Sequence, residues 1–316
     1  MNPERIEVIA TTISGSIRDW SKVERIAPLF AERGFKSVRI HSVDSHREAR
    51  VRTAEVLGDG ARTVISAGGS GTFNAVLEGC CDSGVPLGEI RLGFLRKGSA
   101  DLIGKALEIP DAVDEAVAVF ARAITEDRTV PCDVLRAEDA SGQSPPRHFV
   151  GYGGAGIFGR VPYFTENRFI KWYKGVLGQF FGDLGPFAVG MALALGESMA
   201  LRPFRRRPLW RLVVDDATRG EGHYHAVILA NGHLGRDFPY SSDPLGSGRV
   251  HAFGLRDLGV RHVVGQVLRA WKGTITEDPD RWGWEPLTIG TTLRIEFTPP
   301  RPFPFNVDGT TFPCRG

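Results

Sequence analysis

The stretch of residues 64–79 limits the possible folds of this chain more than any other. A short β-branched run leads into three glycines, Gly68, Gly69 and Gly71, and an amphipathic helical pattern follows. A turn of this kind between a strand and a helix can aim backbone N–H groups and a helix N-terminus at a phosphate. Glycines carry no Cβ, so the backbone can approach such a ligand closely. The alternative is a tight connection in which a hydroxyl residue such as Ser70 caps the helix.

Strand-like and helical patterns alternate along residues 1–131. Strands are expected at 6–13, 37–43, 62–66 and 90–95, and helices at 20–33, 45–57, 72–81 and 111–124. This alternation predicts a parallel sheet with helices on both faces. In such a sheet the turns that follow the strands lie at one edge, where ligands bind. Gly98 and Ser99 follow the fourth strand, so the sequence predicts a second phosphate-binding turn beside the first.

The pattern changes after Pro131. Strands are expected at 132–137, 147–152, 210–214, 224–230, 250–255 and 292–297, with turn-rich pieces at 138–146 and 215–222. We therefore expect a β-rich, antiparallel second domain at 132–316, after an α/β domain at 1–131. A helical insertion is expected near 163–201. Its longest uncharged stretch, 184–196, is shorter than the ~20 residues that a membrane span needs.

Composition excludes some classes of protein. The net charge of +2 over 316 residues gives no overall attraction to nucleic acid, so no nucleic-acid partner is expected. The four cysteines have no CxxC spacing, and the N-terminus lacks an apolar signal core. We therefore expect a cytoplasmic protein with reduced thiols. No feature of the sequence indicates an oligomeric state.

Neither standard phosphate-binding motif is present. A dinucleotide fingerprint needs a third glycine where Asn74 stands, and a P-loop needs a lysine before the hydroxyl residue. The run Gly68-Gly-Ser-Gly-Thr-Phe-Asn74 instead resembles the GGDGT-x-N signature of the diacylglycerol kinase catalytic-domain family, which includes sphingosine, ceramide and bacterial lipid kinases. Other segments resemble further motifs of this family in the same order along the chain. They are Ile13-Ser-Gly15, residues 92–110, Pro131-Cys-Asp133, residues 149–159, Ala230-Asn-Gly232 and Val307-Asp-Gly309. NAD kinases share the glycine turn, but the block at 98–110 is more similar to the lipid kinases.

The resemblance implies an ATP- and Mg²⁺-dependent lipid kinase. Its fold would be an α/β nucleotide-binding domain followed by a β-sandwich, with the active site in the cleft between them. The γ-phosphoryl group would pass to a hydroxyl of a diacylglycerol-, sphingoid- or ceramide-type lipid. The implied nucleotide-binding residues are Ser14, Gly15, Gly68, Gly69, Ser70, Gly71, Thr72, Asn74, Gly98 and Ser99. The implied acidic residues are Asp101, Asp133 and Asp308, of which Asp101 and Asp133 would hold Mg²⁺ through water.

Three acidic positions of the family pattern carry a hydroxyl residue in this chain, and Ala100 replaces an asparagine of the block at 92–110. Ser70 replaces the aspartate of GGDGT, Ser247 replaces the aspartate of a later turn, and Thr310 replaces the glutamate of DGE. A hydroxyl group cannot act as a general base at neutral pH without an activating neighbour. A catalytically silent lipid- or nucleotide-binding pseudokinase and an NAD kinase-like small-molecule kinase therefore stay open as alternatives. Turn-capping roles for Asp133 and Asp308 stay open as well.

The segment of residues 202–211 contains five arginines with Phe204 and Trp210 between them. Each cation near an anionic membrane contributes ~1 kcal/mol to binding. We expect peripheral contact with the inner face of the membrane. The residues that would make this contact are Arg205, Arg206, Arg207 and Trp210. A solvated charged loop is the alternative.

Overall fold

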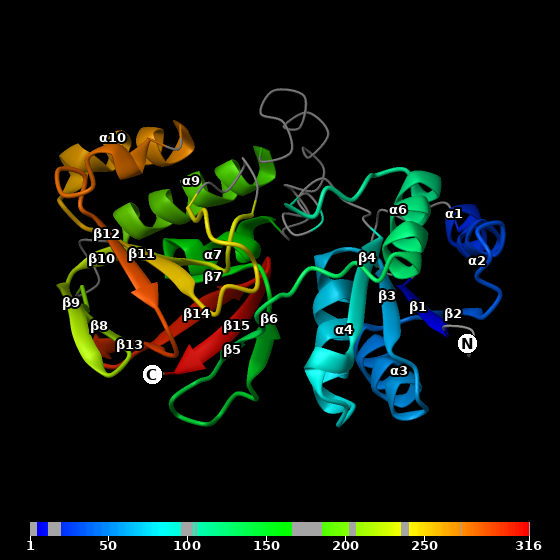
Figure 1. The fold of residues 1–316 in the computed structure, drawn as a ribbon. Coiled ribbons are helices and arrows are strands. Elements are labelled where there is room, and N and C mark those ends of the chain that lie inside the picture. The colour runs from blue at the N-terminus through cyan, green and yellow to red at the C-terminus, as the bar shows by residue number, and fades with distance from the viewer. Residues whose placement is uncertain are drawn as a thin grey trace. The chain divides into compact units, whose positions relative to one another are not determined.

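The computed structural model describes residues 5–11, 20–95, 104, 106–165, 185–201, 207–234, 240–272 and 274–315. The chain divides into two compact units, Met1–Pro131 and Cys132–Gly316. Figure 1 colours the first from blue to teal and the second from green to red.

Unit 1 contains a four-stranded parallel sheet in the order β2–β1–β3–β4. The strands are β1 (Ile6–Thr11), β2 (Val38–Val43), β3 (Thr63–Ala67) and β4 (Arg91–Leu95). Every residue of the central strands β1 and β3 is buried, as is typical of parallel strands covered on both faces. The predicted parallel sheet is confirmed.

Helices cover both faces of this sheet. They are α1 (Ser21–Glu24), α2 (Ile26–Ala31), α3 (His46–Gly58), α4 (Ser70–Asp82) and α6 (Val113–Thr125), with a short 3-10 helix at Leu87–Glu89. Val8 of β1 packs with α1, α2 and α6 in one core, whereas Ile9 packs with α3 and α4 in another. Successive strand residues point to opposite faces, so one strand supplies both cores. The helix predicted at 20–33 is divided at Arg25 into α1 and α2.

Unit 2 is a β-sandwich of antiparallel sheets. The large sheet has the order β12–β11–β10–β7–β14–β15, and the small one β13–β8–β9. Ala155 and Val227 of the large sheet share a core with Trp210, Leu212 and Phe297 of the small sheet. The predicted change from a parallel α/β fold to an antiparallel β-rich fold is confirmed.

The strands of unit 2 are β5 (Leu135–Ala137), β6 (Arg147–Phe149), β7 (Tyr152–Gly156), β8 (Leu209–Val214), β9 (Ala217–Gly222), β10 (Tyr224–Ala230), β11 (Val250–Arg256), β12 (Trp284–Ile289), β13 (Leu293–Thr298), β14 (Pro302–Val307) and β15 (Thr310–Arg315). Its helices are α7 (Ile157–Thr165), α9 (Gly185–Ala200) and α10 (Val260–Lys272), with a 3-10 turn at Ile275–Glu277. Strands β5 and β6 form a separate antiparallel pair.

One prediction for unit 2 is wrong, and helix α10 and strands β12, β14 and β15 were not predicted. Residues 217–222, expected to be turn, form strand β9, because they pair with β8 despite two glycines. Within the helical insertion predicted at 163–201 the structure describes α7 and α9, and residues 166–184 lie outside the described residues. In the part of the chain that the structure describes, no helix is long and apolar enough to span a membrane.

Candidate functional site

The glycine turn connects β3 to α4 at the carboxyl edge of the parallel sheet. Gly69 stands at the N-cap of α4 with an extended backbone (φ −86°, ψ −175°), and its carbonyl accepts the amides of Thr72 and Phe73, both at 3.0 Å. The amides of Ser70 and Gly71 belong to the first helical turn, where no intrahelical acceptor exists. They give this helix end a partial positive charge. The turn is therefore suited to bind an anion.

The sheet order places this turn where a ligand is expected. Strand β1 lies between β2 and β3, so the chain winds outward in opposite directions from the β1/β3 pair. In parallel α/β sheets of this order, ligands bind beside the carboxyl ends of the strands at that switch point. The turn after β3 starts at this place. The strand order and the local geometry of the turn therefore both indicate a ligand-binding position here.

Thr72 fixes the position of the turn. Its Oγ1 lies 2.7 Å from Oγ1 of Thr11, the last residue of β1, and both side chains are fully buried. A Cβ on Gly68 would lie 2.2 Å from Thr72 Oγ1. Gly68 is therefore required by the packing of Thr72, whereas the sequence suggested close approach of a ligand. Contact between Thr72 and a nucleotide stays a prediction.

His46 is a neighbour of the turn that sequence reasoning missed. It begins α3, where Ser45 Oγ accepts the amide of Glu48 at 3.0 Å and Glu48 Oε2 accepts the amide of Asp44 at 2.9 Å. The pair resembles a capping box, except that Glu48 accepts the amide one residue before the N-cap Ser45, and it fixes the start of the helix. A Cβ on Gly71 would lie 2.7 Å from Cε1 of the exposed His46 side chain. The ring therefore lies beside the first turn of α4, a contact between separate helices that no local pattern reveals.

Of the other predicted nucleotide-binding residues, the structure describes Ser70 and Asn74. Ser70 is exposed, and no side chain makes a cap hydrogen bond at the start of α4, so the hydroxyl-capping alternative is not what the structure shows. Asn74 is half-buried on the same helix. The predictions for Ser14, Gly15, Gly98, Ser99, Asp101, Arg205 and Arg206 lie outside the described residues.

In unit 2, Asp308 lies in the turn between β14 and β15. Asp308 and Gly309 both have positive φ, 45° and 83°, and Val307 pairs with Thr310. This is a two-residue hairpin of the type that favours Asp-Gly. The Asp308 carboxylate, 3% exposed, accepts the amides of Val150 at 2.9 Å, Gly151 at 3.0 Å and Tyr152 at 2.7 Å. Burial raises the pKa of Asp308 to about 6, and the three N–H donors act in the opposite direction.

Asn231 binds the same segment of backbone and joins Asp133 to it. Asn231 Nδ2 donates to the carbonyl of Asp133 at 2.7 Å and to that of Val150 at 2.8 Å. One oxygen of the Asp133 carboxylate accepts the amide of Gly248 at 2.7 Å. We call Asp133, Asn231 and Asp308 the acidic cluster. The structure thus brings together three predicted motifs that are far apart in the sequence, and their polar groups bind backbone.

The described carboxylates do not by themselves fit a Mg²⁺ site. Both oxygens of Asp308 accept backbone N–H groups, and one oxygen of Asp133 is used in the same way. Among the residues that the structure describes, no group of three or more His, Cys, Asp or Glu side chains could hold a metal ion. We therefore assign no step of a reaction to Mg²⁺.

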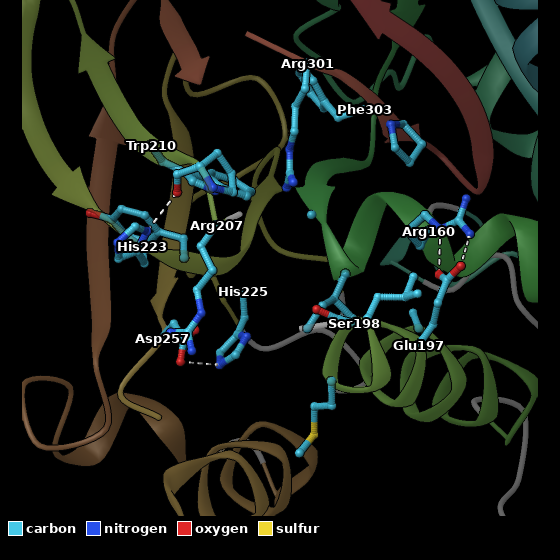
Figure 2. Close-up of a pocket in the computed structure, with 18 of the residues that line it drawn as sticks. Arg160, Glu197, Ser198, Arg207, Trp210, His223, His225, Asp257, Arg301 and Phe303 are labelled. Atoms are coloured by element: carbon cyan, nitrogen blue, oxygen red, sulfur yellow. Dashed lines mark hydrogen bonds and ion pairs between the residues drawn. The ribbon is translucent and has the colours of Figure 1, made fainter. Parts of the chain in front are cut away.

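Figure 2 shows a pocket of about 470 Å³ whose lining includes the last residue of β7 and the first residues of β10 and β14. The acidic cluster lies at the other end of these strands. Arg160 binds Glu197 with N–O distances of 3.0 and 2.6 Å, and Arg207 binds Asp257 at 3.0 Å. Two of the lining arginines thus each face a carboxylate, so much of the positive charge of the pocket is compensated. This balance is unlike that of a phosphate site, where cations face the ligand.

The pocket also shows where two residues of the expected membrane contact lie. Trp210 is 2% exposed and packs at 4.6 Å between ring centroids on Phe297 inside the sandwich. Its buried indole differs from the exposed aromatic contact that the sequence suggested, because β8 turns this residue toward the core. Arg207 is exposed but paired with Asp257.

The chain is similar in sequence and in fold to known diacylglycerol kinases. Residues 5–137 match the model of the diacylglycerol kinase catalytic domain. The diacylglycerol kinase of Staphylococcus haemolyticus (strain JCSC1435) is 26% identical over 224 residues, which cover 64% of this chain and 61% of that protein. A crystal structure of a diacylglycerol kinase from Bacillus anthracis str. Sterne has a TM-score of 0.64 at 14% identity, covering 100% of this chain and 93% of that one. A second structure from that organism, assigned to the same kinase class, has a TM-score of 0.69 at 16% identity, with 100% and 93% covered.

Residues 5–137 are thus similar to a diacylglycerol kinase catalytic domain, and the chain spans about three fifths of the length of the curated relative. The family model spans the parallel sheet, the glycine turn and the start of unit 2, and the solved structures share the fold of the whole chain. The resemblance carried by the motifs is confirmed.

Proposed function

We propose that this protein is an ATP-dependent lipid kinase that transfers the γ-phosphoryl group to a lipid hydroxyl, with diacylglycerol as the leading substrate. One observation carries the proposal. The open N-terminus of α4 lies behind the glycine turn at the β1/β3 switch point, inside the segment that matches the diacylglycerol kinase catalytic domain. The name of the Staphylococcus relative favours diacylglycerol over a sphingoid base or ceramide.

The proposed role of the turn is to hold phosphate oxygens. Phosphoryl transfer depends mainly on positioning and on neutralising the charge of the transferred group. The amides of Ser70 and Gly71 would supply fixed N–H donors for this purpose, and such preorganised donors stabilise developing charge. The Thr11–Thr72 hydrogen bond supports the proposal, because it holds the helix end against the sheet before any ligand binds.

On the acceptor side, we propose that Asp101 accepts the proton of the substrate hydroxyl. Asp308 and Asp133 are weaker candidates, because their carboxylates bind the backbone amides of their own unit. We also propose that ATP is the phosphoryl donor and that the reaction requires Mg²⁺, because the chain resembles the diacylglycerol kinase family.

A specific observation favours a catalytically silent protein as the second candidate. Two of the hydroxyl residues at family acidic positions are tied to backbone. Thr310 Oγ1 donates to the carbonyl of Val307 at 2.9 Å, and Ser247 Oγ accepts the amide of Arg249 at 3.2 Å. These side chains act in turns, so they do not replace the lost carboxylates. The alternative is a pseudokinase that binds nucleotide or lipid without transfer.

The test is incubation with labelled ATP, Mg²⁺ and soluble dioctanoylglycerol, sphingosine, short-chain ceramide or NAD. Label on a lipid supports the proposal, ATP binding without transfer supports the pseudokinase, and labelled NAD supports the small-molecule kinase. Asp101→Ala should abolish transfer while ATP affinity stays within about threefold. Ser70→Ala is the matched control, because Ser70 is exposed and makes no cap bond. An active Asp101→Ala with an inactive Ser70→Ala would contradict the assignment.

A further inference from the structure

Helix α10 is orange in Figure 1, and several of its apolar side chains are exposed to solvent. Val260 is 52% exposed, Val264 67%, Val267 43% and Leu268 54%. Their spacing of four, seven and eight residues places them on one face of the helix. We call these four residues the apolar stripe. A contiguous exposed apolar surface of this kind on a folded protein usually marks a contact with a partner or a membrane.

The orientation of α10 is fixed by its other side. Val263 and Gln266 are 3% and 1% exposed, and Gln266 Nε2 donates to the carbonyls of Arg256 at 3.0 Å and Trp282 at 2.8 Å. A Cβ on Gly265 would lie 2.3 Å from the Trp282 ring, which therefore packs directly on the helix backbone. These contacts bury the polar side chain of Gln266 and leave the apolar stripe exposed. The stripe is therefore exposed although the helix is firmly packed against the rest of unit 2.

The charges of α10 indicate what covers the stripe. The helix contains Arg261, Arg269 and Lys272 and no aspartate or glutamate. Arg261 and Lys272 are exposed, and they stand seven residues before and four residues after Leu268, which places them beside the stripe. An apolar face bordered by cations is typical of helices that lie in a membrane interface. Anionic lipids attract such cations.

A second copy of the chain fits this surface less well. Most homodimers are two-fold symmetric, so each patch meets its own copy. Two copies of α10 would bring like charges together, with no carboxylate on the helix to pair with them. An anionic bilayer matches both the apolar stripe and the cations.

We propose that α10 docks this protein on an anionic bilayer, with the apolar stripe in the interface and Arg261 and Lys272 at the level of the lipid phosphates. The choice of a bilayer rests in part on the proposed function, because a lipid kinase must reach a substrate that resides in membranes. The proposed contact is therefore made by α10 and not by the arginine-rich segment at 202–211. In that segment Arg207 is ion-paired and Trp210 is buried.

The experiment is co-sedimentation of the full chain with vesicles of phosphatidylcholine and phosphatidylglycerol, 70:30, in low salt, without ATP. Val264→Glu with Leu268→Glu should weaken binding at least tenfold. The matched control is Val51→Glu with Val130→Glu, which adds the same charges at positions that are 49% and 60% exposed elsewhere in the chain. This control should bind like the wild type, and thermal unfolding should show both variants folded.

A second variant separates the cations from the stripe. Each cation near the surface contributes ~1 kcal/mol, about a fivefold change in affinity. Arg261→Ala with Lys272→Ala should therefore weaken binding to the anionic vesicles by more than tenfold, and pure phosphatidylcholine should not distinguish it from the wild type.

Three outcomes would overturn the proposal. They are no vesicle binding by the wild type, equal binding by the α10 variant and its control, or a wild-type dimer in light scattering that Val264→Glu with Leu268→Glu dissociates. The last outcome would make the stripe a self-association surface. Failure of the proposed kinase function is a separate result, because it would show as no transfer to soluble dioctanoylglycerol whether or not vesicles bind.

Discussion

The glycine turn of unit 1 is predicted from its motif to bind nucleotide, and Asp133 and Asp308 of the acidic cluster in unit 2 are predicted to be catalytic. The hydrogen-bonding groups of the two regions differ in availability. At the turn, the amides of Ser70 and Gly71 belong to a helix end that lacks intrahelical acceptors. In the cluster, the Asp308 carboxylate already accepts three backbone amides. The comparison teaches that one motif can leave its backbone donors available while another becomes an internal support of its own unit. The following predictions test this difference.

The largest effect is expected from Asp308→Ala. The change leaves the amides of Val150, Gly151 and Tyr152 without their acceptor, and each unsatisfied buried group costs about 1–3 kcal/mol. We expect the free energy of unfolding to fall by about 3–5 kcal/mol in urea denaturation. Asp308→Asn, which keeps one acceptor oxygen, should lose less. A loss below about 1 kcal/mol for Asp308→Ala would mean that the carboxylate does not support the fold.

The second prediction concerns pH. Burial raises the pKa of Asp308 from 3.8 to about 6, so between these values the native protein holds a proton that the unfolded chain releases. The free energy of unfolding should therefore fall as pH rises from about 4 to about 6, by up to about 3 kcal/mol. The difference between wild type and Asp308→Asn across this range isolates the effect. Parallel pH profiles for the two proteins would contradict the prediction.

The third prediction compares two glycines of the same turn. In Gly68→Ala the new Cβ would meet the buried Thr72 side chain at 2.2 Å, which would displace Thr72 from Thr11. We expect a loss of about 2 kcal/mol in stability and at least tenfold weaker ATP binding. In Gly71→Ala the nearest atom, at 2.7 Å, belongs to the exposed ring of His46, which can rotate away. Alanine also favours the helix by about 1 kcal/mol.

Gly71→Ala should therefore be as stable as the wild type or more stable, with ATP affinity within about threefold. Calorimetric titration with an ATP analogue and urea denaturation measure both quantities. Equal effects of the two substitutions would show that the Thr72 contact does not define the turn.

The smallest effect is expected from Ser70→Ala. The side chain is exposed and makes no cap hydrogen bond, so the free energy of unfolding should change by less than about 0.5 kcal/mol. Transfer to lipid should stay within about twofold. A large loss of turnover without loss of stability would place the Ser70 hydroxyl in the chemistry.

The sequence predicts unit 1 better than unit 2. Strands β1 to β4 and helices α3, α4 and α6 are close to their expected positions, because buried strands and amphipathic helices of this length carry clear periodic patterns. Strand β9 was missed because Gly220 and Gly222 favour turns, and its strand form depends on pairing with β8. Helix α10 was missed because its valines also fit a strand, and its apolar face points to solvent.

By itself, then, the sequence determined the order of elements in unit 1, the change to antiparallel strands after it, and the place of the glycine turn. These features depend on residues that are neighbours in the chain. Only the tertiary structure decided that Thr72 binds Thr11, that Asn231 links Asp133 to the backbone segment that Asp308 binds, and that α10 turns its apolar stripe outward. Each of these depends on contacts between residues distant in sequence, which no local pattern records.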